Sequence, residues 1–166
     1  EAKSFADTHR MLETVARALG KPGQGDALFA SIQRRVAVAS ARMPASWRGQ
    51  KVYFEVADAP YAAGEASFLG ETLAQLGLGN VVPAGMGPFP KLNPEFIVRA
   101  NPDLIMIGQR SADGLFARPG WQSIRALREQ RVCIFPTEDA NVLVRPGPRM
   151  AEAARIMAKC IVDKVR

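Results

Sequence analysis

The sequence predicts an α/β fold: a Rossmann-like lobe with a mostly parallel sheet flanked by helices, preceded by a long bridging helix. Two observations support this prediction. From residue 51 onward, short apolar segments alternate with segments of helical periodicity, a pattern typical of parallel sheets with helices on both faces. The residues before 45 show helical periodicity only. The length of 166 residues accommodates one such domain with a helical addition.

Two helices are expected before the sheet. Residues 4–19 place their apolar side chains near one face, and Gly20 then ends the helix. Residues 25–43 carry a stripe with the 3.6-residue period of an amphipathic helix. The residues of this stripe are Leu28, Ile32, Val36, Ala39 and Met43. Pro44 ends this second helix, and residues 45–50 connect it to the domain.

The alternating region contains short apolar or β-branched segments, each bounded by turn residues. The predicted strands are 52–56, 80–82, 103–107 and 131–135. The predicted helices are 65–76, 94–100 and a terminal helix from 148 to about 165, with short helical pieces through 121–127. Ligands of such sheets bind at the loops that leave the carboxyl ends of the strands. These loops are 58–64, 109–114 and 139–147, joined by 85–90 if segment 80–82 belongs to the sheet.

The stretch from Gly85 to Gly108 combines a loop, a helix start and a strand. Phe89 stands in a loop rich in Gly and Pro. Asn93 is suited to cap the next helix, Pro94 suits its first position, and Glu95 places a carboxylate in its exposed first turn. The loop aromatic is a candidate for contact with a ligand, and the exposed carboxylate of Glu95 is a candidate for contact with a partner protein.

Composition and charge exclude several function classes. The net charge of +6 suggests nucleic acid, but the basic residues are scattered and no aromatic residues alternate with them. No segment approaches the ~20 apolar residues of a membrane span. The sequence starts at Glu1 without a signal peptide, so either a leader was removed or the sequence starts inside a longer protein. We expect no nucleic-acid binding and no membrane-spanning segment.

The cysteine and histidine residues of the sequence do not form a metal-binding motif. Cys133 and Cys160 fit neither a zinc motif nor a redox C-x-x-C motif. Two buried thiols are the preferred interpretation, and a disulfide between strand and terminal helix is the alternative, which the sequence cannot decide. The single histidine, His9, excludes a His-rich transition-metal site within the chain.

Motifs of the common enzyme classes are absent from the sequence. There is no G-x-S-x-G, G-x-x-x-x-G-K or G-x-G-x-x-G pattern. An enzyme would have to use scattered carboxylates with no informative spacing, namely Glu55, Asp58, Glu65 and Glu71. We therefore predict no enzymatic activity. The alternative, a small α/β enzyme of unknown reaction, requires carboxylates with shifted pKa values to converge in one pocket.

Four segments carry a family resemblance. They are Y-F-E-V-A-D-A-P-Y-A-A-G-E-A-S-F-L-G, P-F-P-K-L-N-P-E-F-I-V-R-A-N-P-D-L-I, R-P-G-W and V-L-V-R-P-G-P-R-M. Together they resemble the second lobe of the helical-backbone (class III) substrate-binding proteins of ABC importers for vitamin B12, haem and iron-siderophores. The resemblance covers about residues 51–163.

The resemblance implies an organisation and a function. Residues 1–22 would be the last helix of a mostly missing N-terminal lobe, 23–46 the interlobe bridging helix, and 47–166 the C-terminal α/β lobe. The protein would be periplasmic, or lipid-anchored outside the cytoplasmic membrane, with no cofactor of its own. It would bind a metal chelate (cobalamin, haem or a ferric siderophore) and deliver it to the permease. A third interpretation is an assembly module that dimerises through the exposed first helices.

The resemblance also implies site residues, each with a simpler alternative. Glu95 matches the rim glutamate that pairs with permease arginines, or only complements its helix dipole. Phe89 matches a cleft aromatic, which is tryptophan in B12-binding members, or anchors its loop on the sheet. Tyr61 binds ligand or caps its loop. Arg145 matches a cleft arginine, or contacts the last helix or solvent.

Overall fold

The predicted fold class is confirmed by the computed structural model, which describes residues 2–57 and 60–164. The α-helices are α1 (Phe5–Ala18), α2 (Gln24–Ala41), α3 (Phe68–Gln75), α4 (Pro94–Ala100), α5 (Gln109–Ala112), α6 (Arg125–Arg128), α7 (Thr137–Leu143) and α8 (Met150–Lys164). The strands are β1 (Lys51–Ala57), β2 (Tyr61–Ala62), β3 (Gly79–Asn80), β4 (Leu104–Gly108) and β5 (Val132–Phe135). Short 3-10 helices lie between these elements at η1 (Ala45–Trp47), η2 (Ala84–Met86), η3 (Leu115–Ala117) and η4 (Trp121–Ser123).

The sheet has the order β2-β1-β4-β5, and β3 also pairs with β1. β1, β4 and β5 are parallel neighbours, and β3 is parallel to β1. β2 runs antiparallel to the carboxyl end of β1. The carboxyl ends of three adjacent strands therefore meet at one edge, which is where ligands of open α/β sheets bind.

Side chains alternate between two cores because successive residues of a strand point to opposite faces. Phe54 and Met106 pack on one face with α2, α3, α7 and α8. Tyr53 and Ile105 pack on the other face with Trp121 and α4. Covering both faces explains why β4 is an unbroken apolar run rather than an alternating one.

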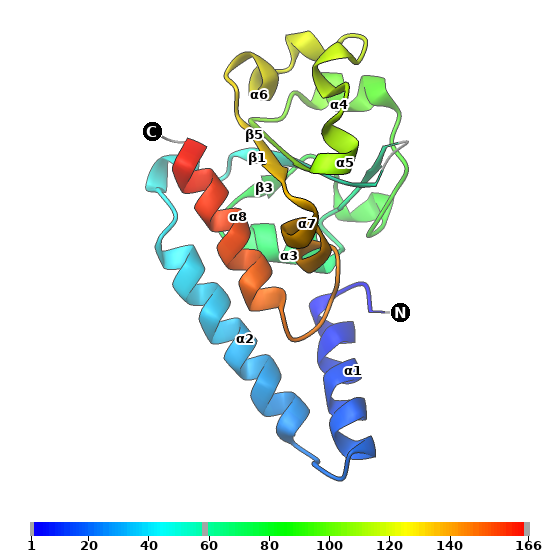
Figure 1. Ribbon diagram of the computed structural model, residues 1–166, viewed down its shortest axis with the longest axis vertical. Helices are drawn as coiled ribbons and strands as arrows, with labels where there is room; N and C mark the ends of the chain where they lie inside the picture. The colour runs from blue at the N-terminus through cyan, green and yellow to red at the C-terminus, as the bar shows by residue number, and fades with distance from the viewer. Residues whose placement is uncertain (1, 58–59, 165–166) are drawn as a thin grey trace.

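Helices α1 and α2 form a hairpin that extends away from the sheet, and α2 lies alongside α8 (Figure 1). Gly25 allows the close approach of α1 and α2, since a Cβ at this position would lie 2.4 Å from the Cα of Glu13. The outer face of α1 is an apolar stripe of Met11, Val15 and Leu19, which are 37%, 52% and 70% exposed. The apolar side chains of residues 4–19 were expected near one face, but Leu19 is exposed whereas Leu12 and Ala16 are buried.

Several boundaries differ from the sequence prediction. Segment 139–147, expected to be a loop, begins within α7, which has buried Val142 and Leu143. The helix expected at 65–76 starts only after Ser67, whose hydroxyl accepts the Gly70 N–H and caps α3. The strand expected at 80–82 pairs through Gly79 and Asn80 instead. For α3, the cap by Ser67 sets the start of the helix.

Cys133 of β5 and Cys160 of α8 are joined by a disulfide. The preferred sequence interpretation, two free buried thiols, was wrong. The two cysteines are separated by 27 positions in the sequence, and only the packing of α8 on β5 brings them together. Among the described helices, none is long and apolar enough to cross a membrane.

Candidate functional site

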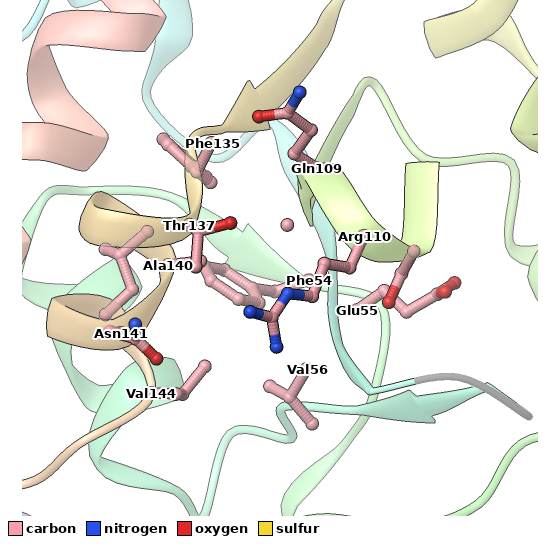
Figure 2. Close-up of a pocket in the computed structure, with 13 residues that line it drawn as sticks. Phe54, Glu55, Val56, Gln109, Arg110, Phe135, Thr137, Ala140, Asn141 and Val144 are labelled. Atoms are coloured by element: carbon pink, nitrogen blue, oxygen red, sulfur yellow. The ribbon is translucent and has the colours of Figure 1, made fainter. Parts of the chain in front are cut away.

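A cavity of about 160 Å³ opens where the carboxyl ends of β1, β4 and β5 meet. Figure 2 shows the side chains around it. The described lining residues are Phe54, Glu55, Val56, Gly108, Gln109, Arg110, Ser111, Phe135, Thr137, Ala140, Asn141, Leu143 and Val144. They come from the ends of the three strands and from α5 and α7, the helices that follow β4 and β5. This is the edge at which the sequence predicted a ligand.

The floor and walls of this cavity are apolar. The rings of Phe54 and Phe135 stack with their centroids 6.3 Å apart and an interplanar angle of 18°. Both rings are buried, whereas Val56 and Val144 are partly open to solvent at the mouth. At Gly108, a Cβ would lie 3.4 Å from the Cβ of Ala140, so a glycine lets β4 end close against α7.

A buried ion pair lies at one side of the cavity. The Glu55 carboxylate accepts bonds from Arg118 Nη1 at 2.6 Å and Nη2 at 2.8 Å, and from the Tyr53 hydroxyl at 2.8 Å. Burial and the adjacent Glu55 carboxylate raise the pKa of the Tyr53 phenol. The Arg118 guanidinium also lies over the Trp121 ring, 4.6 Å from its centroid. The charge of Glu55 is therefore matched by Arg118.

The rest of the cavity rim is polar. Gln109, Thr137 and Asn141 contribute amide and hydroxyl groups, and Arg110 extends its guanidinium across the mouth toward Asn141 and Val144 (Figure 2). Within residues 2–57 and 60–164, no ion pair or hydrogen bond of the Arg110 side chain is present. The cavity thus combines an apolar wall with an exposed arginine that has no ion-pair partner among the described residues.

A second cavity, of about 840 Å³, lies beside the first turn of α4 and is called here the Glu95 groove. Its described lining residues are Pro60, Asn93, Pro94, Glu95, Val98, Arg99, Arg118, Pro119, Gly120 and Trp121. It is larger than the first cavity, but it is built on a helix and a turn rather than on the strand ends. The smaller cavity lies at the strand ends, where open α/β sheets bind ligands, and is therefore the candidate ligand site.

Glu95 is exposed on this groove, in the position that the sequence predicted. The Asn93 side chain accepts the Glu95 N–H at 2.9 Å, and Pro94 occupies the first turn of α4. The carboxylate is thus fixed at a helix N-terminus and open to solvent.

Tyr61 and Phe89 lie on neighbouring segments. Tyr61 bridges to Lys91, and the Ala62 N–H donates to the Pro90 carbonyl at 3.1 Å. The Tyr61 side chain is 41% exposed. Phe89 is half-buried with its ring against Phe68, at a centroid distance of 5.9 Å. Neither residue is among those that line the strand-end cavity, so a ligand contact by either stays a prediction.

Arg145 is exposed and follows Val144, the last lining residue of the strand-end cavity. It does not line the cavity itself, and its ligand contact also stays a prediction.

The cavity residues that sequence reasoning missed are chiefly Arg110, Thr137 and Asn141. The loops 109–114 and 139–147 were named as ligand-binding edges, which is the signal that could have identified Arg110 and Asn141.

The candidate carboxylates of the enzyme alternative do not converge in the described part of the chain. Glu55 alone of them lines the strand-end cavity. Glu65 is exposed and accepts the Ala84 N–H, while Glu71 accepts the Phe5 N–H at the base of α1. Asp58 lies outside the described residues.

Comparison with known sequences gives two matches of note. A family model described as "Periplasmic binding protein" matches residues 1–138. The Bacillus subtilis (strain 168) protein named "Uncharacterized ABC transporter substrate-binding lipoprotein YvrC" is 27% identical over 97% of this chain. The chain spans 52% of that relative's length.

Solved structures show the same fold. A periplasmic solute-binding protein from Staphylococcus epidermidis superposes with a TM-score of 0.80 at 22% identity, covering 97% of this chain and 64% of that one. The periplasmic heme-binding protein RhuT from Roseiflexus sp. RS-1, in apo form, superposes with a TM-score of 0.75 at 24% identity, covering 98% of this chain and 65% of that one.

Proposed function

The chain belongs to the periplasmic binding protein family, and from this premise we propose that it forms part of the solute-binding component of an ABC importer. The observation that carries the proposal is the strand-end cavity. Its volume of about 160 Å³ is below the roughly 300–1,000 Å³ of a complete small-molecule site. A one-sided site of this kind suits a protein that encloses its ligand between two lobes.

The proposed organisation has this chain as the C-terminal lobe with α2 as the interlobe bridge. Residues 1–22 then form the last helix of an N-terminal lobe. The apolar stripe of Met11, Val15 and Leu19 supports this organisation, because exposed apolar patches mark surfaces that pack against another body. Dimerisation through α1 and α2 would also cover this stripe, and the mass of the complete protein in solution separates the two.

The proposed ligand is a metal chelate: cobalamin, haem or a ferric siderophore. An apolar wall with few polar groups suits a chelate whose organic shell encloses the metal. The proposed role is non-enzymatic, and the proposed location is the periplasm or a lipid anchor outside the cytoplasmic membrane. The Cys133–Cys160 disulfide supports that location, since disulfides persist in oxidising compartments.

The test of the binding function is a spectroscopic titration of the complete protein, as its organism produces it, with cyanocobalamin, haemin and ferric siderophores. We expect saturable binding of one of them at micromolar concentration or below. Absence of binding to all of them, or their chemical conversion by the protein, would contradict the proposal.

Glu95 is the proposed contact with arginines of the permease. An exposed ion pair contributes only about 0.2–1 kcal/mol, so its role is to orient and accelerate docking rather than to supply affinity. We expect Glu95→Gln to slow association with the permease and to leave ligand affinity unchanged. Glu138→Gln is the matched control, because Glu138 is an exposed glutamate in the first turn of α7. Equal association rates for both variants would rule out this role.

A further inference from the structure

The strand-end cavity has a charge that its own residues do not balance. Among its described lining residues, the charged side chains are Glu55 and Arg110. Glu55 is 2% exposed and is bonded bidentately to Arg118, so its carboxylate is already satisfied. The guanidinium of Arg110 has no partner in the described part of the chain and extends across the mouth (Figure 2).

The polar side chains near Arg110 do not neutralise its charge, and they do not compete with it for an acidic group of a ligand. Gln109, Thr137 and Asn141 are uncharged, and their side chains have no hydrogen-bond partner within residues 2–57 and 60–164. They can donate to the oxygens of an anion that the arginine holds. A guanidinium offers paired N–H groups that match a carboxylate in a bidentate geometry.

Opposite this polar group the cavity is apolar. Val56 and Val144 are accessible, with Val144 38% exposed, and the stacked rings of Phe54 and Phe135 form the layer beneath them. The site therefore presents an apolar contact and an anion contact side by side. A ligand that uses both must carry a negative group on the edge of an apolar body.

From this arrangement we propose that the ligand is an anionic chelate, with a carboxylate or similar oxyanion at its edge, and that Arg110 binds this anionic group. This inference rests on the proposed function and narrows the class of ligand that the protein would bind. It favours chelates with ionised carboxylates or catecholates over neutral ones. The valines contact the apolar part of the same ligand.

The test compares matched ligands on the complete protein. Haemin and its dimethyl ester share one ring and differ in the two carboxylates, and an anionic ferric catecholate is paired with the neutral ferrichrome. Cyanocobalamin, with no net charge, is a further neutral probe. We expect the wild-type protein to bind an anionic member of this set at least about tenfold more tightly than its neutral counterpart.

The Arg110→Gln variant should weaken binding of that anionic ligand at least about tenfold, equivalent to about 1.4 kcal/mol. It should change the affinity for the neutral counterpart less than about twofold. Arg110→Lys keeps the charge and should retain part of the affinity. Arg128→Gln, which removes an exposed arginine at the end of α6, is the control for net charge and should have no effect.

The outcomes separate the two proposals. Preference for a neutral chelate, or equal binding of the anionic ligand by Arg110→Gln and wild type, overturns the inference and leaves the proposed function intact. Failure of the wild-type protein to bind any probe overturns the proposed function, and the inference falls with it. Circular dichroism and thermal unfolding of each variant verify that losses do not come from unfolding.

Discussion

Glu55 and Arg118 form a bidentate pair between the strand-end cavity and the Glu95 groove. Glu55 is among the residues of the strand-end cavity with its carboxylate buried, and the Arg118 guanidinium, 2.6 and 2.8 Å from that carboxylate, belongs to the residues that line the Glu95 groove. The proposed ligand surface and the proposed docking surface thus share one buried interaction.

Removing the arginine of this pair should lower the stability of the folded protein. Arg118→Met leaves the Glu55 carboxylate buried without its cation, and we expect a loss of about 3 kcal/mol in the free energy of unfolding, measured with urea. Arg125→Met is the control, because the Arg125–Asp103 pair has 49% of the arginine side chain exposed. That variant should lose less than about 1 kcal/mol. Similar losses for the two variants would show that the Glu55 site tolerates an unpaired charge.

The disulfide should account for a measurable share of stability. It closes a loop of 27 positions, for which chain entropy predicts about 3.5 kcal/mol. We expect the double variant Cys133→Ala/Cys160→Ala to lose about that amount, and a reductant to lower the urea midpoint of the wild type alone. A double variant that remained sensitive to reductant would mean that another bond is being broken.

Gly25→Ala tests the contact between α1 and α2. A Cβ at this position would lie 2.4 Å from backbone atoms of Glu13, so we expect overpacking to cost about 1–3 kcal/mol. Helix propensity alone predicts the opposite sign, since alanine favours a helix by about 1 kcal/mol over glycine. Gly85→Ala is the control, because a Cβ there meets nothing within 4 Å. A gain in stability from Gly25→Ala would contradict the close approach.

Glu71 should make a pH-dependent contribution to stability. Burial raises the pKa of its carboxyl above 4.5, partly opposed by the hydrogen bond from the Phe5 N–H. The folded protein thus binds this proton more tightly than the unfolded chain does. The stabilisation is present below the unfolded pKa and is lost as the pH rises through the folded pKa.

The Glu71→Gln variant keeps an oxygen acceptor for Phe5 and removes the charge. Its free energy of unfolding relative to wild type should therefore increase between pH 4 and pH 7. Glu152→Gln should show the reverse trend, because the hydrogen bond from Arg149 lowers the pKa of Glu152. Parallel pH profiles for the two variants would exclude this role of Glu71.

The location of the candidate site in the fold was predictable from the sequence, but the identity of its lining residues was not. The order of strands and helices located the edge at the ends of β1, β4 and β5, and the capping pattern around Asn93 placed Glu95 in the solvent. Arg110 was not selected, because an arginine in a polar loop has no sequence feature that separates it from solvated ones. Its assignment depends on which side chains surround it after folding.

The amino-acid sequence alone determined the alternation of strands and helices, the long amphipathic helix and the cap of α4, because these follow from periodicity and hydrogen bonds between residues close in the chain. The tertiary structure decided the pairing of Cys133 with Cys160, the neutralisation of Glu55 by Arg118, and the exposed charge of Arg110. Each of these is a contact, or a missing contact, between segments distant in the sequence. Local periodicity carries no information about such distances.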